Sequence, residues 1–166
     1  MEIRSIEAIV AALIAAKVEY LIVGGLAVNA HGYERLTRDV DLVIGLQPEN
    51  IIRGLRALLG IGYEMSVPVT PEDFADPQQR EAWRKDKNMI VLKLWSDVHR
   101  RTPIDVFVYE PFDFASEFAA AKWVKVGGDL EAPVVGYEGL IAMKTAAGRE
   151  KDLLDIKALR KLDPYR

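Results

Sequence analysis

Two aspartates one residue apart open an apolar segment within "VGGLAVNAHGYERLTRDVDLVI", residues 23–44. Because side chains alternate across a strand, Asp39 and Asp41 are predicted to share one face, while Val40 and Leu42 turn toward the core. Two carboxylates about 4 Å apart repel by about 4 kcal/mol at an effective dielectric constant near 20. A cation offsets this repulsion, and Mg²⁺ takes one or two protein carboxylates and fills its shell with water and phosphate oxygens. The pair therefore predicts a Mg²⁺ site, with Mn²⁺ as the alternative ion; the competing interpretation is two solvated residues at a strand start.

A third carboxylate, Asp105, interrupts the apolar segment "TPIDVFVYE", residues 102–110. If this strand neighbours the strand of Asp39, three carboxylates can hold two cations about 3.5–4 Å apart. Such a centre suits in-line phosphoryl or nucleotidyl transfer, in which one ion activates the attacking hydroxyl and the other steadies the leaving pyrophosphate. The alternative is that Asp105 only caps a strand that begins after Thr102 and Pro103.

The glycine pair Gly24–Gly25 lies between an apolar strand and the start of a helix. Backbone N–H groups at such a place accept phosphate, and the absence of Cβ atoms lets a triphosphate approach the main chain. The pair taken alone is also ordinary turn punctuation. The combination is more specific: an apolar strand, two glycines, thirteen residues, and Asp-Val-Asp at the start of a second strand.

Alternating strands and helices are needed to position these residues. The periodicity predicts an α/β (α+β) fold, in which a mixed β-sheet is flanked by helices, as a single domain over 1–166 with a core of about 18–110. The expected strands are 19–25, 39–46, 62–69, 88–96, 102–110 and a hairpin over 122–136 around Gly127–Gly128. The expected helices are an N-terminal one capped by Ser5, then 26–32, 48–60, 76–87, 111–121 and two C-terminal helices within about 136–162.

Composition excludes several classes of protein. The chain has 166 residues and no cysteine, so disulfides and thiolate metal sites are excluded and the cytoplasm is the expected location. The apolar stretch 8–16 is shorter than the ~20 residues of a membrane span, so no membrane association is expected. A net charge of −3 argues against non-specific nucleic-acid binding.

The glycine pair and Asp-x-Asp together resemble the nucleotidyltransferase fold of DNA polymerase beta. Within it, "AVNAHGYERLTRDVDLVI" and "LIAMKTAAGREKDLLDI" are similar to the bacterial AbiEii-like nucleotidyltransferases, whose members include toxins of toxin–antitoxin pairs. The resemblance spans 20–46, Asp105 and about 134–159. It implies metal ligands and catalytic acids at the three aspartates, Asp39, Asp41 and Asp105.

The same resemblance implies a nucleotide-binding set at the glycine pair, at the Arg-x-Thr lead-in and in the C-terminal helices: Gly24, Gly25, Arg35, Thr37 and Lys144. The Arg-x-Lys-Asp motif falls on Arg149, Lys151 and Asp152. One departure is notable, because many members have a serine after the first glycine, whereas Gly25 supplies no hydroxyl to the phosphates.

The resemblance implies a Mg²⁺-dependent nucleotidyltransferase, with two ions expected, that moves NMP from an NTP to a hydroxyl on RNA, protein or a small molecule. A toxin role would add an antitoxin partner. Two alternatives remain open: a nucleotide- or partner-binding module that has lost turnover, and an aminoglycoside-type nucleotidyltransferase. The polar segment 70–88 is the predicted place for acceptor specificity.

Three further side chains carry predictions. His31 is expected to make a backbone hydrogen bond at a helix end. Lys144, on a largely apolar helix, is the predicted phosphate ligand, and the alternative is that its stem only extends from the core. The last helix is predicted to turn Leu153, Ile156 and Leu159 inward and to expose Glu150, Lys151, Asp152 and Lys157.

Overall fold

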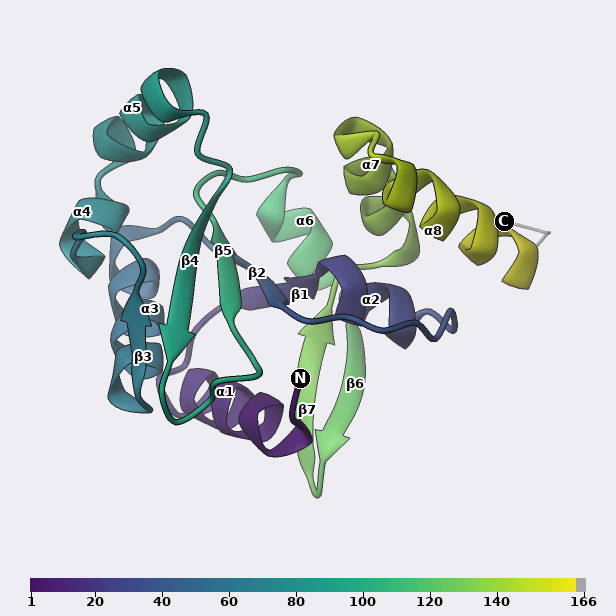
Figure 1. The fold of residues 1–166 in the computed structure, drawn as a ribbon, viewed down its shortest axis with the longest axis horizontal. Coiled ribbons are helices and arrows are strands. Elements are labelled where there is room, and N and C mark those ends of the chain that lie inside the picture. Colours follow the sequence, from purple (N-terminus) through teal and green to yellow (C-terminus); the bar gives the residue numbers. More distant parts are fainter. Residues whose placement is uncertain (164–166) are drawn as a thin grey trace.

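The computed structural model describes residues 1–163, which form one mixed seven-stranded sheet with helices around it (Figure 1). The strand order is β3-β4-β5-β2-β1-β7-β6. The strands are β1 (Tyr20–Val23), β2 (Val40–Ile44), β3 (Tyr63–Met65), β4 (Val91–Ser96), β5 (Ile104–Phe107), β6 (Lys122–Gly127) and β7 (Leu130–Val134). The helices are α1 (Ile3–Ala15), α2 (Gly24–Ala30), α3 (Pro48–Gly60), α4 (Pro71–Ala75), α5 (Pro77–Lys87), α6 (Phe114–Ala119), α7 (Tyr137–Ala147) and α8 (Glu150–Leu162).

The centre of the sheet combines parallel and antiparallel pairs. β2 pairs antiparallel with β1 and parallel with β5, and β1 pairs parallel with β7. β6 and β7 form the predicted hairpin, and β3 and β4 complete the other edge. The predicted mixed sheet flanked by helices is therefore confirmed.

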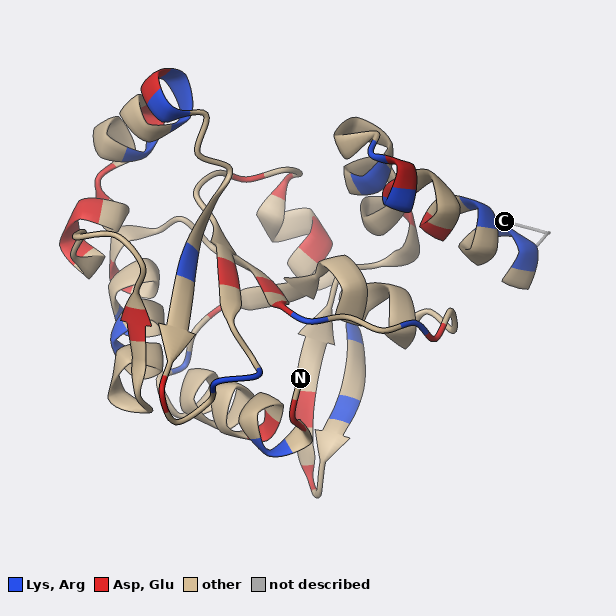
Figure 2. Cartoon of the chain, in the orientation of Figure 1, with Lys and Arg blue, Asp and Glu red and all other residues tan. Residues whose placement is uncertain are grey.

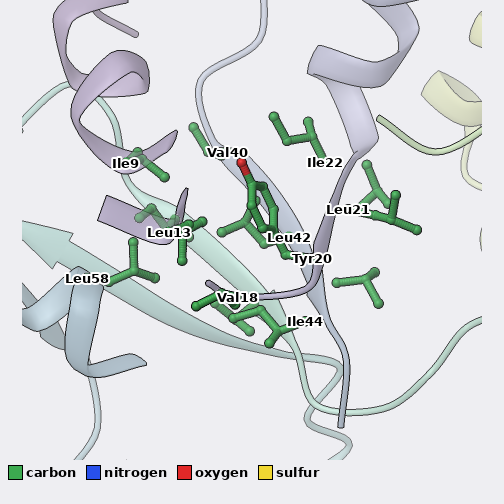
Figure 3. Packing of buried hydrophobic residues seen from close by; sticks show 14 of the residues in the cluster. Ile9, Leu13, Val18, Tyr20, Leu21, Ile22, Val40, Leu42, Ile44 and Leu58 are labelled. Carbon is green, nitrogen blue, oxygen red and sulfur yellow. The ribbon is translucent and has the colours of Figure 1, made fainter. Parts of the chain in front are cut away.

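The core lies where α1 and α3 cover one face of the sheet. Along β2, Val40, Leu42 and Ile44 point toward side chains of these two helices, among them Leu13 and Leu58 (Figure 3). All five side chains are at most 1% exposed. Because side chains alternate along a strand, Asp41 is directed to the opposite face of β2. Burial of the apolar set thus fixes the direction in which this aspartate points.

Most predicted elements are present, and α3 has the predicted bounds of 48–60. The predicted strand 62–69 is shorter, because β3 ends at Met65, after which Ser66 still donates to Lys93 O of β4 from its N–H and its Oγ. Pro68 follows within two residues, and a proline cannot donate to a ladder. Helix α4 was not expected; a capping box between Thr70 and Asp73 starts it.

The expected cap at Ser5 is wrong. Helix α1 begins at Ile3, with Glu2 at its N-cap position, and the Glu2 N–H donates to Thr102 Oγ1. Ser5 lies in the first turn, is buried, and its Oγ is 2.9 Å from His99 Nδ1. A tertiary contact therefore uses the hydroxyl that local sequence assigns to a cap.

Helices α7 and α8 pack against each other at one end of the molecule, beyond α2 (Figure 1). No helix among residues 1–163 is both long and apolar enough to span a membrane.

Candidate active site

Three charged side chains lie side by side on adjacent strands, and together with Asp39, whose Oδ1 is 3.9 Å from one of them, they form what we call the acid row. Asp41 on β2 is the register partner of Asp105 on β5, and Asp105 is the partner of Lys93 on β4. Figure 2 shows the corresponding bands of opposite charge on these strands. β2 and β5 are adjacent, which was the condition for their aspartates to meet, and Asp105 lies within β5 rather than ahead of it.

Lys93 is the member of this row that sequence reasoning missed. Its Nζ is 3.0 Å from Asp105 Oδ1 and 3.9 Å from Asp39 Oδ1. The side chain of Asp105 is 15% exposed, whereas those of Lys93 and Asp39 are 48% and 40% exposed. The available signal was that Lys93 is the one charge in β4, as Asp105 is in β5.

The carboxylate of Asp41 lies against the glycine pair. Gly24 has φ +63°, and a Cβ added there would overlap the Asp41 side chain. Gly25 N–H donates to the same carboxylate. Burial, then the negative charges of Asp105 and Asp39, raise the pKa of Asp41 to about 6, against the lowering effect of Gly25 N–H and Lys151. The metal-free cluster therefore carries more negative charge than its surroundings offset.

Gly25 faces Thr37 across the turn that follows α2. A Cβ added to Gly25 would overlap the hydroxyl and Cβ of Thr37. The Thr37 side chain thus occupies the space into which a serine at position 25 would project. A hydroxyl is present at this place, although a different residue supplies it.

A second charged cluster joins the loop after α2 to the C-terminal helices. Arg35 donates from Nε and Nη2 to the two oxygens of Asp155, at 2.7 and 2.8 Å. Lys144 Nζ is 2.7 Å from Asp155 and 3.2 Å from Asp152, and Arg149 Nε donates to Asp152 at 2.6 Å. We call these five residues the clamp.

The clamp is internally paired, and its two aspartates and Lys144 are buried, whereas Arg149 is exposed. Lys144, Asp152 and Asp155 are 6%, 1% and 2% exposed. Burial raises the pKa of both aspartates, but hydrogen bonds from Arg35, Lys144 and Arg149 outweigh it and leave each pKa below its usual value.

This geometry corrects the predicted orientation of α8. Asp152 is buried and Leu153 is 57% exposed, the reverse of what was expected, whereas Ile156 and Leu159 are buried as predicted. The inward face follows 152, 155, 156 and 159, which is helical spacing, and the cations of the clamp compensate its two aspartates.

The predicted nucleotide ligands Arg35 and Lys144 are thereby engaged with aspartates, and Lys144 is buried. Lys151 and Arg149, the latter also bonded to Asp152, interact electrostatically with Asp41. Lys151, an exposed residue of α8, lowers the pKa of Asp41, and the charge of Asp41 contributes to raising the pKa of Arg149. The exposed cations at the start of α8 therefore lie within electrostatic range of Asp41.

The donor set fits a divalent cation carried with a triphosphate. Within residues 1–163, no three histidine, cysteine, aspartate or glutamate side chains converge as a ready-made metal site. Asp39 and Asp41 offer the one or two carboxylates that Mg²⁺ takes when phosphate oxygens and water complete its shell. Asp105 Oδ1 is buried and faces the Lys93 ammonium at 3.0 Å. Lys93 therefore lies between Asp39 and Asp105, so the three aspartates do not form one uninterrupted group.

Two remaining predictions can be placed. His31 ends α2, and its Nε2 is 2.8 Å from Val135 O, which confirms the backbone contact expected of it. Segment 70–88 spans α4 and α5, near a cavity of about 590 Å³ whose lining includes Arg80, Arg84 and Tyr109.

Comparisons with known proteins relate the structure to nucleotidyltransferases. No family model and no curated protein sequence matches this chain. Its structure is similar to that of an antigenic nucleotidyltransferase-like protein from Paracoccidioides brasiliensis, with a TM-score of 0.57 and 19% identity over 97% of this chain and 76% of that one. It is also similar to the lincosamide antibiotic adenylyltransferase LnuA with lincomycin bound, with a TM-score of 0.51 and 18% identity over 87% of each chain. The chain therefore has a nucleotidyltransferase-like fold, which it shares with an adenylyltransferase enzyme.

Proposed function

We propose that this protein is a metal-dependent nucleotidyltransferase that moves NMP from an NTP to a hydroxyl acceptor. The observation that carries the proposal is the same-face pair of Asp41 and Asp105, in register on adjacent strands, with exposed Lys151 acting on Asp41 from α8. Carboxylates for a cation and a basic side chain for phosphates are the two parts that such a reaction needs.

Asp39 and Asp41 would hold the divalent cation, Mg²⁺ or Mn²⁺. Their strand position supports this assignment, because Asp41 is held by the Gly24–Gly25 turn and its repulsion from Asp39 and Asp105 is relieved by a cation. When bound, the ion supplies positive charge to the oxygens of the triphosphate.

Asp105 would be the general base. It accepts the proton of the acceptor hydroxyl while that oxygen forms a bond to the α-phosphorus. The bond from the α-phosphorus to the bridging oxygen breaks, and pyrophosphate leaves with its electron pair. The partial burial of Asp105 supports this role, and the Lys93 ammonium, 3.0 Å from Oδ1, holds the carboxylate in position.

Lys151 and Arg149 would contact the β- and γ-phosphates, and the Thr37 hydroxyl would take the part of the serine that position 25 lacks. Contacts within the clamp support an indirect part for Arg35 and Lys144, which were first predicted as nucleotide ligands. Because both hold Asp155, they would position α8 rather than touch phosphate.

The acceptor is proposed to enter beside α4 and α5, where segment 70–88 and the 590 Å³ cavity lie. RNA, a protein or a small molecule can present the hydroxyl. The AbiEii-like motifs favour a toxin that acts on a macromolecule and is held by an antitoxin. The lincosamide enzyme favours a small-molecule acceptor, and this is the second candidate.

The test is incubation of the purified chain with each labelled NTP and Mg²⁺ in a cell lysate, with and without added small hydroxyl compounds. A labelled RNA or protein band that Asp41→Asn removes supports the proposal. Asp105→Asn should lower the rate sharply and leave NTP binding largely intact. Binding of NTP with no transfer to any acceptor would favour the module that has lost turnover.

A further inference from the structure

The position of Lys93 bears on how many metal ions the proposed site holds. Its ammonium lies between two of the three aspartates, 3.0 Å from Asp105 Oδ1 and 3.9 Å from Asp39 Oδ1. The backbone sets this position, because Lys93 and Asp105 are direct partners in the antiparallel pair of β4 and β5. Directly opposite residues have Cβ atoms about 4.5–5.5 Å apart, so the contact is inherent in the register.

A second metal ion and this ammonium would need the same carboxylate edge. A two-ion centre places its ions about 3.5–4 Å apart and would take Asp105 as a ligand of one of them. Mg²⁺ binds oxygen at about 2.0–2.1 Å, so an ion on Asp105 Oδ1 would lie close to the Lys93 ammonium, which is 3.0 Å from the same oxygen. Two positive groups at this separation also repel each other strongly.

The charges of the row agree with one ion. Before the triphosphate binds, three carboxylates and one ammonium carry a formal charge of −2, which matches one divalent cation. The donor geometry agrees as well, because in the described chain the three aspartates do not converge as a single ready-made metal site. Asp39 and Asp41 remain for the ion that accompanies the triphosphate.

We propose that Lys93 is a fixed cation of the active site that takes the place of a second metal ion beside Asp105, so that the chain binds one divalent cation. This inference rests on the proposed function. Lys93 is a positioning residue in this scheme: it holds Asp105 toward the acceptor hydroxyl and offsets the charge of Asp105 and Asp39 without an exchangeable ion.

Mn²⁺ binding in the presence of a non-hydrolysable NTP analogue tests the proposal, with free Mn²⁺ followed by electron paramagnetic resonance. Wild type should bind one Mn²⁺ per chain. Lys93→Met should bind two, and its first ion should bind about tenfold more tightly because a neighbouring positive charge is gone. Lys93→Arg, which keeps a fixed cation, should still bind one. Lys125→Met, which removes an exposed lysine from β6, is the matched control and should behave as wild type.

Thermal melting gives a second measurement that does not depend on turnover. Without metal, Lys93→Met leaves three carboxylates with no resident cation, so Mn²⁺ should raise its melting temperature more than it raises that of wild type. Lys93→Gln repeats the measurement with a polar side chain of similar length, in case the methionine variant folds poorly.

Several results would overturn the inference. Two ions in wild type, or one ion in both wild type and Lys93→Met, would leave Lys93 as an ordinary cross-strand surface pair. If Asp41→Asn still abolished Mn²⁺ binding in that case, the proposed function would stand alone. Absence of Mn²⁺ binding in every variant would reject both proposals.

Discussion

The acid row on β2, β5 and β4 and the clamp at the C-terminal helices differ in charge balance: the acid row has excess negative charge, whereas the charges of the clamp are paired. The row has three carboxylates and one lysine and opens to solvent at Lys93 and Asp39. In the clamp, three cations share two aspartates that are at most 2% exposed. Each carboxylate of the clamp has two cationic partners, whereas Asp41 accepts one backbone hydrogen bond and repels its neighbours.

The two clusters therefore respond to pH with opposite signs. The folded pKa of Asp41, about 6, lies above the unfolded value near 4, so the contribution of Asp41 to stability is fully present below pH 4 and is lost as pH rises through 6. The folded pKa values of Asp152 and Asp155 are lowered, so the stability they contribute is present above pH 4 and is lost as pH falls. The balanced charges of the clamp stabilise the fold, whereas the unbalanced carboxylates of the acid row suit the cation that we propose for this site.

The largest expected effect comes from a substitution in the acid row. Asp41→Asn should reduce nucleotidyl transfer to background, because it removes a carboxylate from the proposed ion and from Gly25 N–H. The metal-free variant should nevertheless be more stable than wild type at pH 7, by up to about 3 kcal/mol, since a buried charge and its repulsions are gone. Turnover assays and denaturant titrations in EDTA at pH 4 and 7 measure both quantities. Wild-type turnover in Asp41→Asn, or an equal loss of its stability at pH 4 and pH 7, would contradict the expected difference between the acid row and the clamp.

A substitution in the clamp should lower stability instead of raising it. Lys144→Met leaves Asp152 and Asp155 buried with one cation each, and removing one partner of a buried ion pair costs about 3–5 kcal/mol. We expect a loss near the lower end, because Arg149 and Arg35 remain. Denaturant unfolding measures it, with Lys157→Met as the control on the exposed side of α8. A variant with unchanged stability and a ten- to hundredfold loss of NTP affinity would restore Lys144 as a phosphate ligand.

Moving the hydroxyl from position 37 to position 25 tests whether these two side chains share one space. Gly25→Ser should lower stability by about 1–3 kcal/mol, because the new side chain overlaps Thr37. Thr37→Ala should fold normally and bind NTP more weakly. The double variant Gly25→Ser with Thr37→Ala should recover both stability and affinity, since one hydroxyl again occupies the space. Melting curves and NTP titrations of the three variants test this, and additive losses in the double variant would show that the two positions do not share a space.

The smallest expected effect distinguishes two exposed lysines of α8, Lys151 and Lys157. Lys151→Ala should weaken NTP binding about tenfold, equivalent to 1.4 kcal/mol, because an exposed cation near Asp41 is lost. Its stability should change by no more than about 0.5 kcal/mol. Lys157→Ala, also exposed on α8, should leave affinity unchanged. Equal losses in both variants would indicate general attraction of the basic C-terminus for the triphosphate rather than a site.

Local sequence was sufficient for much of the fold and part of the site. The bounds of α3 follow from Pro48, Gly60 and an apolar helical period. The common face of Asp39 and Asp41 follows from strand alternation once Val40 and Leu42 must be buried. Their apposition to Asp105 was conditional in the sequence, and it became definite only when β2 and β5 paired in parallel.

The tertiary structure alone decided which charges meet. Both 152/155/156/159 and 153/156/159 are helical spacings, so periodicity cannot choose the inward face of α8. The choice depends on Arg35, 120 residues before Asp155, and on Lys144 of the neighbouring helix α7, which compensate the buried aspartates. Lys93 is a similar case: on an isolated β4 it is a solvated lysine, and it becomes a cation of the acid row only because the register places it opposite Asp105. Periodicity depends on neighbours along the chain, whereas the free energy of a charge depends on whichever groups the folded chain brings within a few ångströms of it.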